Sequence, residues 1–295
     1  CNEKSIVRRI LMAKVKATVH GAVSIVSAIA SKKGATLGIS LKVEATVETS
    51  VGKGIIIQSE NKSLSSRLIN KTIEKIVSKK DLEKNKITIT LTSEIPTGYG
   101  LKSSSAISSV VALACAKIFK PKLTDKQILL AGVEASIETK VSITGAYDDA
   151  CSCYYGGFNV TDNGKRNRII FEKIPSNLSA IIFIPKNRKR GNLKKLKILS
   201  SIFNNAWELA SEKKYWEAMT INGLATSSIL NSDPKIIVDL IDKGALGASV
   251  SGNGPSIAAI VKKENISNVK KIFSNLEGSI IVSKINNKKA EVHEL

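Results

Sequence analysis

Two glycines, a lysine and three serines lie close together in one short segment, residues 95–106 (IPTGYGLKSSSA). The segment follows an alternating, strand-like run at 87–93 and leads into an apolar, helix-like run at 107–119. Glycine lets a backbone approach an anion closely, and the free amides at a helix start attract phosphate. The segment therefore predicts an anion site between a strand and a helix.

Two common nucleotide-binding motifs do not match this segment. A P-loop has glycine directly before its lysine, whereas Leu101 precedes Lys102 here. Gly98 and Gly100 lack the third glycine of the dinucleotide fingerprint. Serine hydroxyls at such a helix start can also bind magnesium. The simpler interpretation, a serine-capped helix with a solvated lysine, stays open on these residues alone.

Composition narrows the class of protein. At 295 residues and 43% hydrophobic content, the chain can fill a sizeable core. The net charge of +20 is spread broadly and is densest at 186–197 (KNRKRGNLKKLK). Only 4% of residues are aromatic, which disfavours base stacking on single strands. A solvated basic surface is the first interpretation; a basic rim near an active site and nucleic-acid binding are the alternatives.

Cysteine and histidine usage disfavours a zinc site and a histidine-rich metal centre. The four cysteines, Cys1, Cys115, Cys151 and Cys153, form no paired zinc spacing, and the chain has two histidines. Reduced thiols suit a cytoplasmic setting. No uncharged apolar run is long enough to predict a membrane span. Residues 1–11 do not resemble a signal peptide, and Met12 could be a translation start.

Periodicity predicts an α+β fold. In the first half, strands are expected at 13–19, 39–47 and 87–93, and helices at 64–77 and 127–140, the latter capped near Thr124. In the second half, strands are expected at 169–171, 180–184, 247–251, 256–261 and 279–285. Helices are expected at 193–212, 216–230 and 266–276, with another starting at Asp233. A boundary between the halves is expected within 160–173.

The segment IPTGYGLKSSSA resembles the second motif of the GHMP kinase superfamily. Two further segments agree: residues 19–22 (VHGA) stand where the first motif is expected, and 249–256 (SVSGNGPS) resemble the third. The resemblance implies an ATP-dependent kinase with a two-lobed α+β fold. Residues 1–165 would form a ribosomal-protein-like N-terminal half and residues 166–295 a ferredoxin-like C-terminal half.

Within the superfamily, the chain is most similar to the archaeal-type shikimate kinases. The similarity rests on residues 34–41 (GATLGISL), 144–150 (TGAYDDA) and the additional residue in LKSSSA. It implies phosphorylation of the 3-hydroxyl of shikimate by ATP and Mg²⁺ in aromatic amino-acid biosynthesis. The alternatives are a homoserine or mevalonate-pathway kinase and, more remotely, a basic RNA-binding protein. The oligomeric state is not indicated.

The resemblance also assigns roles to residues. Asp148 is the expected proton acceptor, with Asp149 as the alternative, because carboxylates often take that role in phosphoryl transfer. Adenine would bind between residues 60 and 86. Magnesium would be held by Ser105 or Ser104 together with Glu138 or Glu134. The candidates for the acceptor site are Thr144, His20 and Lys140. The expected ATP contacts are Pro96, Thr97, Gly98, Tyr99, Gly100, Leu101, Lys102, Ser103, Ser104, Ser105, Ala106, Gly252 and Gly254.

For the carboxylates, simpler structural roles stay open. Glu134 and Glu138 are four residues apart and could form an exposed pair on one helix face. One of the two aspartates could cap a helix or close a turn.

Overall fold

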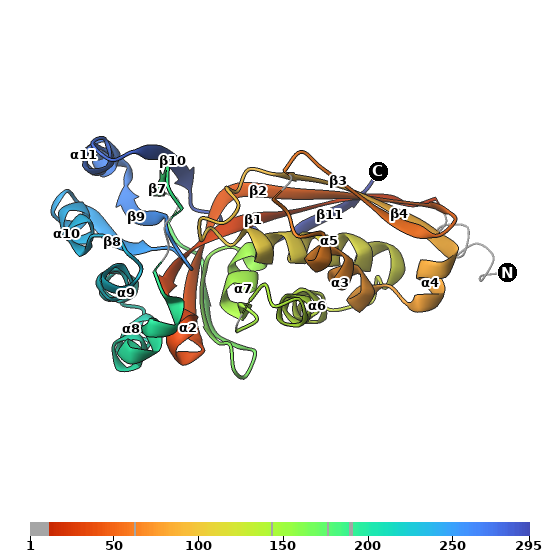
Figure 1. Ribbon diagram of the computed structural model, residues 1–295, viewed down its shortest axis with the longest axis horizontal. Helices are drawn as coiled ribbons and strands as arrows, with labels where there is room; N and C mark the ends of the chain where they lie inside the picture. The colour runs from red at the N-terminus through yellow and green to blue at the C-terminus, as the bar shows by residue number, and fades with distance from the viewer. Residues whose placement is uncertain (1–11, 62, 143, 176, 189–190) are drawn as a thin grey trace.

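The computed structural model describes residues 12–295 except residues 62, 143, 176 and 189–190. The expectations for residues 1–11, including Cys1, lie outside this part of the chain. Two β-sheets with helices packed against them form two lobes (Figure 1). The fold is therefore α+β, as the periodicity predicts.

Two long antiparallel strands, β1 (Lys14–Val26) and β2 (Lys33–Val51), form the centre of the first sheet, with the short helix α2 (Ala28–Ser31) between them. Both are longer than the alternating runs predict. Burial in β1 alternates only in its first half, and from Val19 onward every residue is buried. A strand covered on both faces no longer alternates, which explains why the pattern missed its second half.

The first sheet contains strands from both ends of the chain. Its order is β11-β1-β2-β4-β3, with β5 paired to β2 and β6 paired to β5. The predicted strand at 87–93 is β4 (Asn85–Ser93). The remaining strands are β3 (Gly54–Ser59), β5 (Phe158–Asp162), β6 (Asn167–Glu172) and β11 (Glu291–Glu294).

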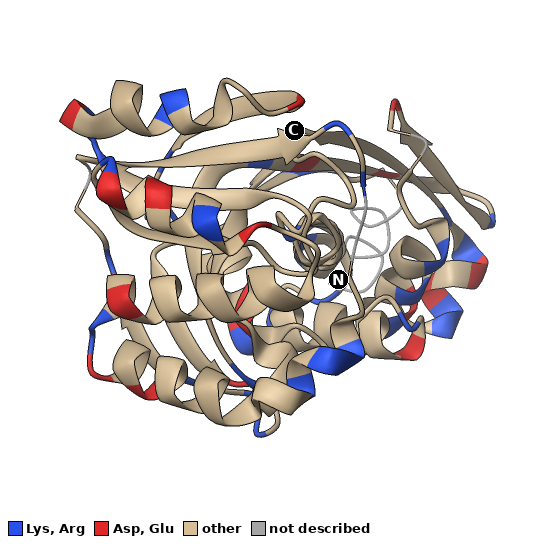
Figure 2. Cartoon of the chain, turned by 60° about the vertical axis from the view of Figure 1, so that its left-hand side comes forward, with Lys and Arg blue, Asp and Glu red and all other residues tan. Residues whose placement is uncertain are grey.

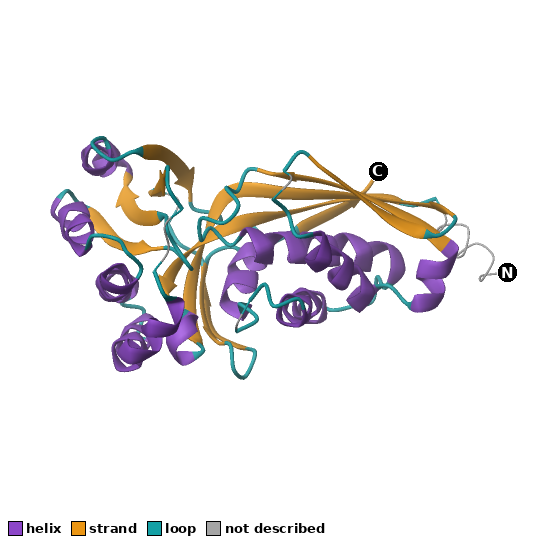
Figure 3. Cartoon of the chain, in the orientation of Figure 1, coloured by secondary structure: helices purple, strands orange, loops and turns teal. Residues whose placement is uncertain are grey.

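Helices cover one face of this sheet (Figure 3). The helix α6 (Asp125–Glu138) begins with the capping box of Thr124 and Gln127, so the predicted cap is confirmed. The helix α5 (Ser103–Phe119) is buried on almost all sides, because it packs between β1, α3 and α6. The others are α3 (Ser66–Ile76), α4 (Lys79–Lys84) and α7 (Tyr147–Tyr155).

The second sheet is antiparallel, in the order β10-β7-β9-β8. Its strands are β7 (Leu178–Pro185), β8 (Ala245–Val250), β9 (Ile257–Lys262) and β10 (Gly278–Lys284). The helix predicted at 193–212 is divided into a 3₁₀ segment and an α-helix. The second half contains η1 (Leu193–Leu199), α8 (Ser200–Ser211), α9 (Tyr215–Ile229), α10 (Pro234–Asp242), η2 (Lys263–Asn265) and α11 (Ile266–Phe273).

The chain passes from the first sheet to the second and returns to the first at its last strand. Strand β6 belongs to the first sheet, β7 begins the second, and β11 returns to pair with β1. The division of the chain between residues 165 and 166 stays a prediction. The fully buried end of β1 lies at the junction of the lobes, where it contacts both α5 and α9.

Candidate active site

The glycine and serine segment connects β4 to α5. Gly98 and Gly100 adopt positive φ angles of 85° and 82°, and Lys102 adopts 67° directly before the helix. Gly100 also lies against the second lobe, because a Cβ atom there would stand 1.9 Å from the backbone oxygen of Ser251. Both the conformation and the close packing at residue 100 therefore require glycine.

The first turn of α5 opens onto a cavity of about 310 Å³. The first helical hydrogen bond runs from Ala106 N to Lys102 O at 2.9 Å. The amides of Ser103, Ser104 and Ser105 therefore precede the helical ladder, and all three residues line the cavity. Such a helix start attracts an anion.

A second glycine loop, SGNGPS, connects β8 to β9 and supports the first. Ser251 Oγ donates a hydrogen bond to Gly100 O at 2.9 Å. Ser256 Oγ donates to Tyr99 O. Gly252 reaches the cavity wall. The second lobe thus fixes the backbone of the first glycine loop from behind.

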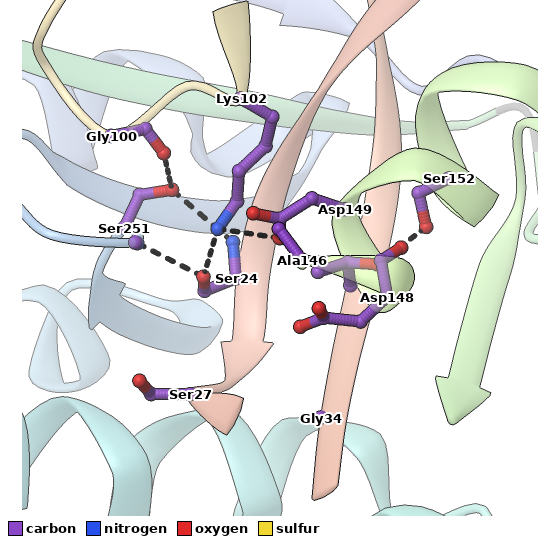
Figure 4. Close-up of polar contacts among 12 residues, drawn as sticks. Ser24, Ser27, Gly34, Gly100, Lys102, Ala146, Asp148, Asp149, Ser152 and Ser251 are labelled. Atoms are coloured by element: carbon purple, nitrogen blue, oxygen red, sulfur yellow. Dashed lines mark hydrogen bonds and ion pairs between the residues drawn. The ribbon is translucent and has the colours of Figure 1, made fainter. Parts of the chain in front are cut away.

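Lys102 is buried at the cavity, with 5% of its side chain exposed. Its Nζ lies 2.9 Å from Asp149 Oδ1 and donates to Ser24 Oγ at 2.7 Å (Figure 4). Ser24 Oγ also accepts a hydrogen bond from Gly252 N at 2.9 Å. An ammonium has three donors, so the hydrogen bond to Ser24 and the ion pair with Asp149 still leave at least one for a ligand.

Asp148 is 4% exposed and stands in the first turn of α7. Asn163 Nδ2 donates to Asp148 Oδ1 at 2.7 Å, and Asp148 N donates to Asn163 Oδ1 at 3.1 Å. The carboxylates of Asp148 and Asp149 point in different directions, the latter toward Lys102 (Figure 4). The two neighbours therefore have different partners.

The environment of Asp148 changes its acidity. Burial, together with the nearby charge of Asp149, raises the pKa of Asp148 to about 7, although Lys102 and the Asn163 hydrogen bond act in the opposite direction. A general base works best when its pKa lies near the working pH. The Asp148 carboxylate has this property.

The segment GATLGISL, at the start of β2, makes room for this carboxylate. A Cβ atom at Gly34 would stand 2.3 Å from Asp148 Oδ2 and 2.9 Å from the Cβ of Ala28. Thr36 Oγ1 donates to Asp148 O at 2.8 Å. Two of the segments that carried the sequence resemblance thus meet at one aspartate.

The two predicted glutamates lie elsewhere. Glu138 forms ion pairs with Lys75 and, at 3.8 Å, with Lys71. Glu134 pairs with Arg166 at 3.2 Å and with Lys75 at 3.5 Å. Neither glutamate is among the residues that line the cavity, where the described carboxylates are Asp148 and Asp149. Their predicted role as magnesium ligands therefore gains no support from this arrangement.

The predicted acceptor residues are separated in the structure. Thr144 lines the cavity. Lys140 is exposed beyond the end of α6, outside the cavity lining. His20 is buried within β1, also outside the lining, and burial together with Lys42 lowers the pKa of its imidazole. Of these three residues, Thr144 is the one placed to contact a molecule in the cavity.

Part of the wall comes from segments that no sequence motif marked. Ser24 and Ser27 come from the end of β1, and Ser136 comes from α6. Asn61 reaches the glycine loop by donating to Thr97 Oγ1 at 2.9 Å, which connects the loop to the segment expected to bind adenine. The remaining lining residues are Ala28, Ile29, Gly98, Leu101, Val141, Ser142, Ala146 and Asn253.

The other sequence expectations concern the whole molecule. Cys115, Cys151 and Cys153 are buried free thiols, as predicted for these three. Basic residues occur on helices and loops of both lobes, near acidic residues, rather than in a single stripe (Figure 2). Across the described residues, no helix combines the length and apolarity needed to cross a membrane.

Comparison with known proteins agrees with this geometry. The model for the N-terminal domain of GHMP kinases matches residues 67–157, which include the glycine and serine loop and both aspartates. The fold is similar to a homoserine kinase from Cytophaga hutchinsonii, with a TM-score of 0.75 and 21% identity over 95% of this chain and 98% of that one. It is also similar to the mevalonate kinase of Methanococcus jannaschii, with a TM-score of 0.72 and 19% identity over 92% and 98%. The chain therefore has the fold of these kinases.

The relatives found by sequence have a higher identity to this chain than these solved structures have. A shikimate kinase from Methanosarcina mazei is 35% identical over 92% of this chain and 94% of its own length. One from Pyrococcus furiosus is 32% identical over 86% and 94%. The chain therefore belongs to the GHMP kinase family, and these archaeal shikimate kinases are its relatives within that family.

Proposed function

We propose that this kinase transfers the terminal phosphoryl group of ATP to the 3-hydroxyl of shikimate, giving shikimate 3-phosphate and ADP. The observation that carries the proposal is the similarity to archaeal shikimate kinases over more than nine tenths of the chain. The site supports it, because an anion-binding helix start, a buried cation, the buried carboxylate of Asp148 and the partly buried carboxylate of Asp149 meet at one cavity.

Asp148 accepts the proton of the attacking hydroxyl in this proposal. The hydroxyl oxygen forms a bond to the γ-phosphorus, the bond from that phosphorus to the bridging oxygen breaks, and its electron pair leaves with ADP. Asp149 holds Lys102 at the cavity, and the third ammonium donor of Lys102 stabilises charge on the transferring group. The amides of the α5 start bind the phosphates.

The residues at the cavity fit a magnesium ion that ATP brings with it. Mg²⁺ keeps several waters and takes one or two protein oxygens beside the phosphates. The hydroxyls of Ser105 and Ser104 line the cavity at the start of α5 and are suitable oxygens. When bound, the ion neutralises phosphate charge. We propose Ser105 as the principal protein ligand, with Ser104 as the alternative.

Thr144, Ser27 and Ser24 supply hydroxyl groups that can contact an acceptor with several hydroxyls. The carboxylate of shikimate also needs a positive partner. Lys102, the one described lysine or arginine that lines the cavity, is assigned to the transferring phosphoryl group in this proposal, so the positive potential of the helix start is what remains to attract that carboxylate. A cytoplasmic location remains a prediction from the reduced thiols.

The acceptor is tested by ADP release with Mg²⁺-ATP and a panel of shikimate, homoserine and mevalonate. Release with shikimate alone is expected. Release only with homoserine or mevalonate would replace shikimate by that acceptor and retain the kinase. A thermal-shift series with Mg²⁺-ATP and a short RNA tests the remoter alternative, because stabilisation by RNA alone would contradict a kinase.

Ser105→Ala should weaken the magnesium-dependent step. The hydroxyl is lost while the backbone amide stays, so phosphate binding by the helix start is retained. We expect the Mg²⁺ concentration for half-maximal rate to rise by about tenfold, as for loss of one supporting ligand contact. A Mg²⁺ titration at saturating ATP measures this, with Ser228→Ala on α9 as the control. An unchanged half-maximal concentration would reject Ser105 as a ligand.

A further inference from the structure

Asn163 stands outside every motif that identified the site. It lies in the turn between β5 and β6 and is 4% exposed. Its backbone amide donates to Lys32 O at 2.8 Å, directly before β2. The side chain is thereby held beside Asp148, with which it forms two hydrogen bonds.

Its hydrogen bonds determine the orientation of the amide group. Asn163 Oδ1 accepts from Asp148 N at 3.1 Å and from Thr161 Oγ1 at 2.8 Å. The opposite orientation would direct an NH₂ group at the Asp148 amide and a carbonyl oxygen at the Asp148 carboxylate, two repulsive contacts. Asn163 Nδ2 therefore donates to Asp148 Oδ1, at 2.7 Å.

We propose that Asn163 is a positioning residue that holds the Asp148 carboxylate in its proton-accepting orientation through these two hydrogen bonds. The inference rests on the proposed function only for the identity of the reaction. The amide occupies Oδ1, and Gly34 leaves space at Oδ2, because any side chain at residue 34 would collide with that oxygen.

A buried general base must be able to lose its proton at the working pH, and its carboxylate must keep a fixed orientation. The Asn163 hydrogen bond contributes to both. A carboxyl this deeply buried would bind its proton too tightly, and a hydrogen bond to the ionised form opposes that effect. A hydrogen bond to a charged group is also directional, so it fixes the rotation of the carboxylate. Asp149 obtains charge compensation from Lys102, whereas the neutral Asn163 leaves Asp148 basic enough to accept a proton.

The test uses Asn163→Ala and Asn163→Asp in the full-length protein. Both variants lose the donor, and Asn163→Asp also adds a carboxylate beside Asp148. We expect the acid limb of the pH profile of kcat/KM to move upward by about one pH unit in Asn163→Ala and further in Asn163→Asp. KM for ATP should stay unchanged. Activity should therefore fall more at pH 6 than at pH 9.

The control is Asn85→Ala, which removes another buried asparagine whose side chain bonds Asp81 O at the end of α4. It should lower stability without moving the pH profile. A ¹³C NMR titration of the Asp148 carboxyl reads the same pKa change without any substrate. An unmoved titration in both Asn163 variants would overturn the proposal. A moved titration in a protein that does not phosphorylate shikimate would instead reject the proposed reaction alone.

Discussion

Asp148→Asn should lower kcat by about 10²–10⁴-fold, the usual contribution of a positioned general base. An amide of the same shape cannot accept the hydroxyl proton. ATP binding should be nearly unchanged, because the phosphates contact the glycine loop and the α5 start in our proposal. Single-turnover ADP release measures the loss in rate, and calorimetric titration of ATP measures binding.

The same substitution should make the protein more stable above pH 7. The pKa of Asp148 is raised from 3.8 to about 7 in the folded protein. Between these values the folded state binds more protons than the unfolded state, so stability falls as pH rises, and above pH 7 the full cost of a buried charge is present. Asparagine has no such cost. We expect a gain on the order of 1–4 kcal/mol at pH 8 that disappears below pH 4.

Urea unfolding from pH 4 to pH 8 measures this gain. Asp242→Asn is a suitable control, because Asp242 is exposed and its pKa is lowered by Lys243, so any pH effect has the opposite sign. Unchanged turnover in Asp148→Asn would move the proton acceptor to Asp149. A loss of stability at pH 8 would contradict the buried-charge argument. Gain of stability with loss of activity is the typical signature of an active-site group.

The elements that the sequence predicts well include those with one buried face. The helices at 66–76 and 125–138 and the strand at 85–93 lie within two residues of expectation at each end. The short buried strands β7, β8 and β9 also lie within two residues of expectation at each end. The extension of a long strand beyond its alternating part, and elements supported mainly by other parts of the chain, were missed. The buried half of β1 has no alternation to detect, and α7 begins at Ala146 in a left-handed conformation without a side-chain cap. The short strand β11 exists because β1 offers it a partner.

The site shows a similar division. The glycine loop and the aspartate pair are local in sequence, so a motif can reveal them. Ser24 and Asn163 are single polar residues brought to the site by the pairing of distant strands, and nothing in their neighbourhood distinguishes them. Glu134 and Glu138, in contrast, were named by the family resemblance but are not among the residues that line the cavity. Glu138 pairs with the lysines of α3, whereas Ser136 of the same helix lines the cavity.

Lys102→Met should lower kcat by about 10²–10³-fold and also destabilise the fold. The catalytic loss follows from removing a charged donor aimed at developing negative charge. The loss of stability, about 2–4 kcal/mol, follows because the Asp149 carboxylate, whose side chain is 16% exposed, loses its partner. Thermal or urea unfolding and ADP release at saturating substrates measure the two effects. Lys243→Met, at an exposed ion pair, should change neither.

The double variant Lys102→Met/Asp149→Asn separates the structural role of this ion pair from its catalytic role. With both charges removed, no buried carboxylate lacks a partner, so stability should return to within about 1 kcal/mol of the parent. Turnover should stay low, because the cation is still absent from the cavity. Recovery of turnover together with stability would show that Lys102 serves only to neutralise Asp149. Recovery of stability alone would place the Lys102 ammonium among the groups that act on the transferring phosphoryl.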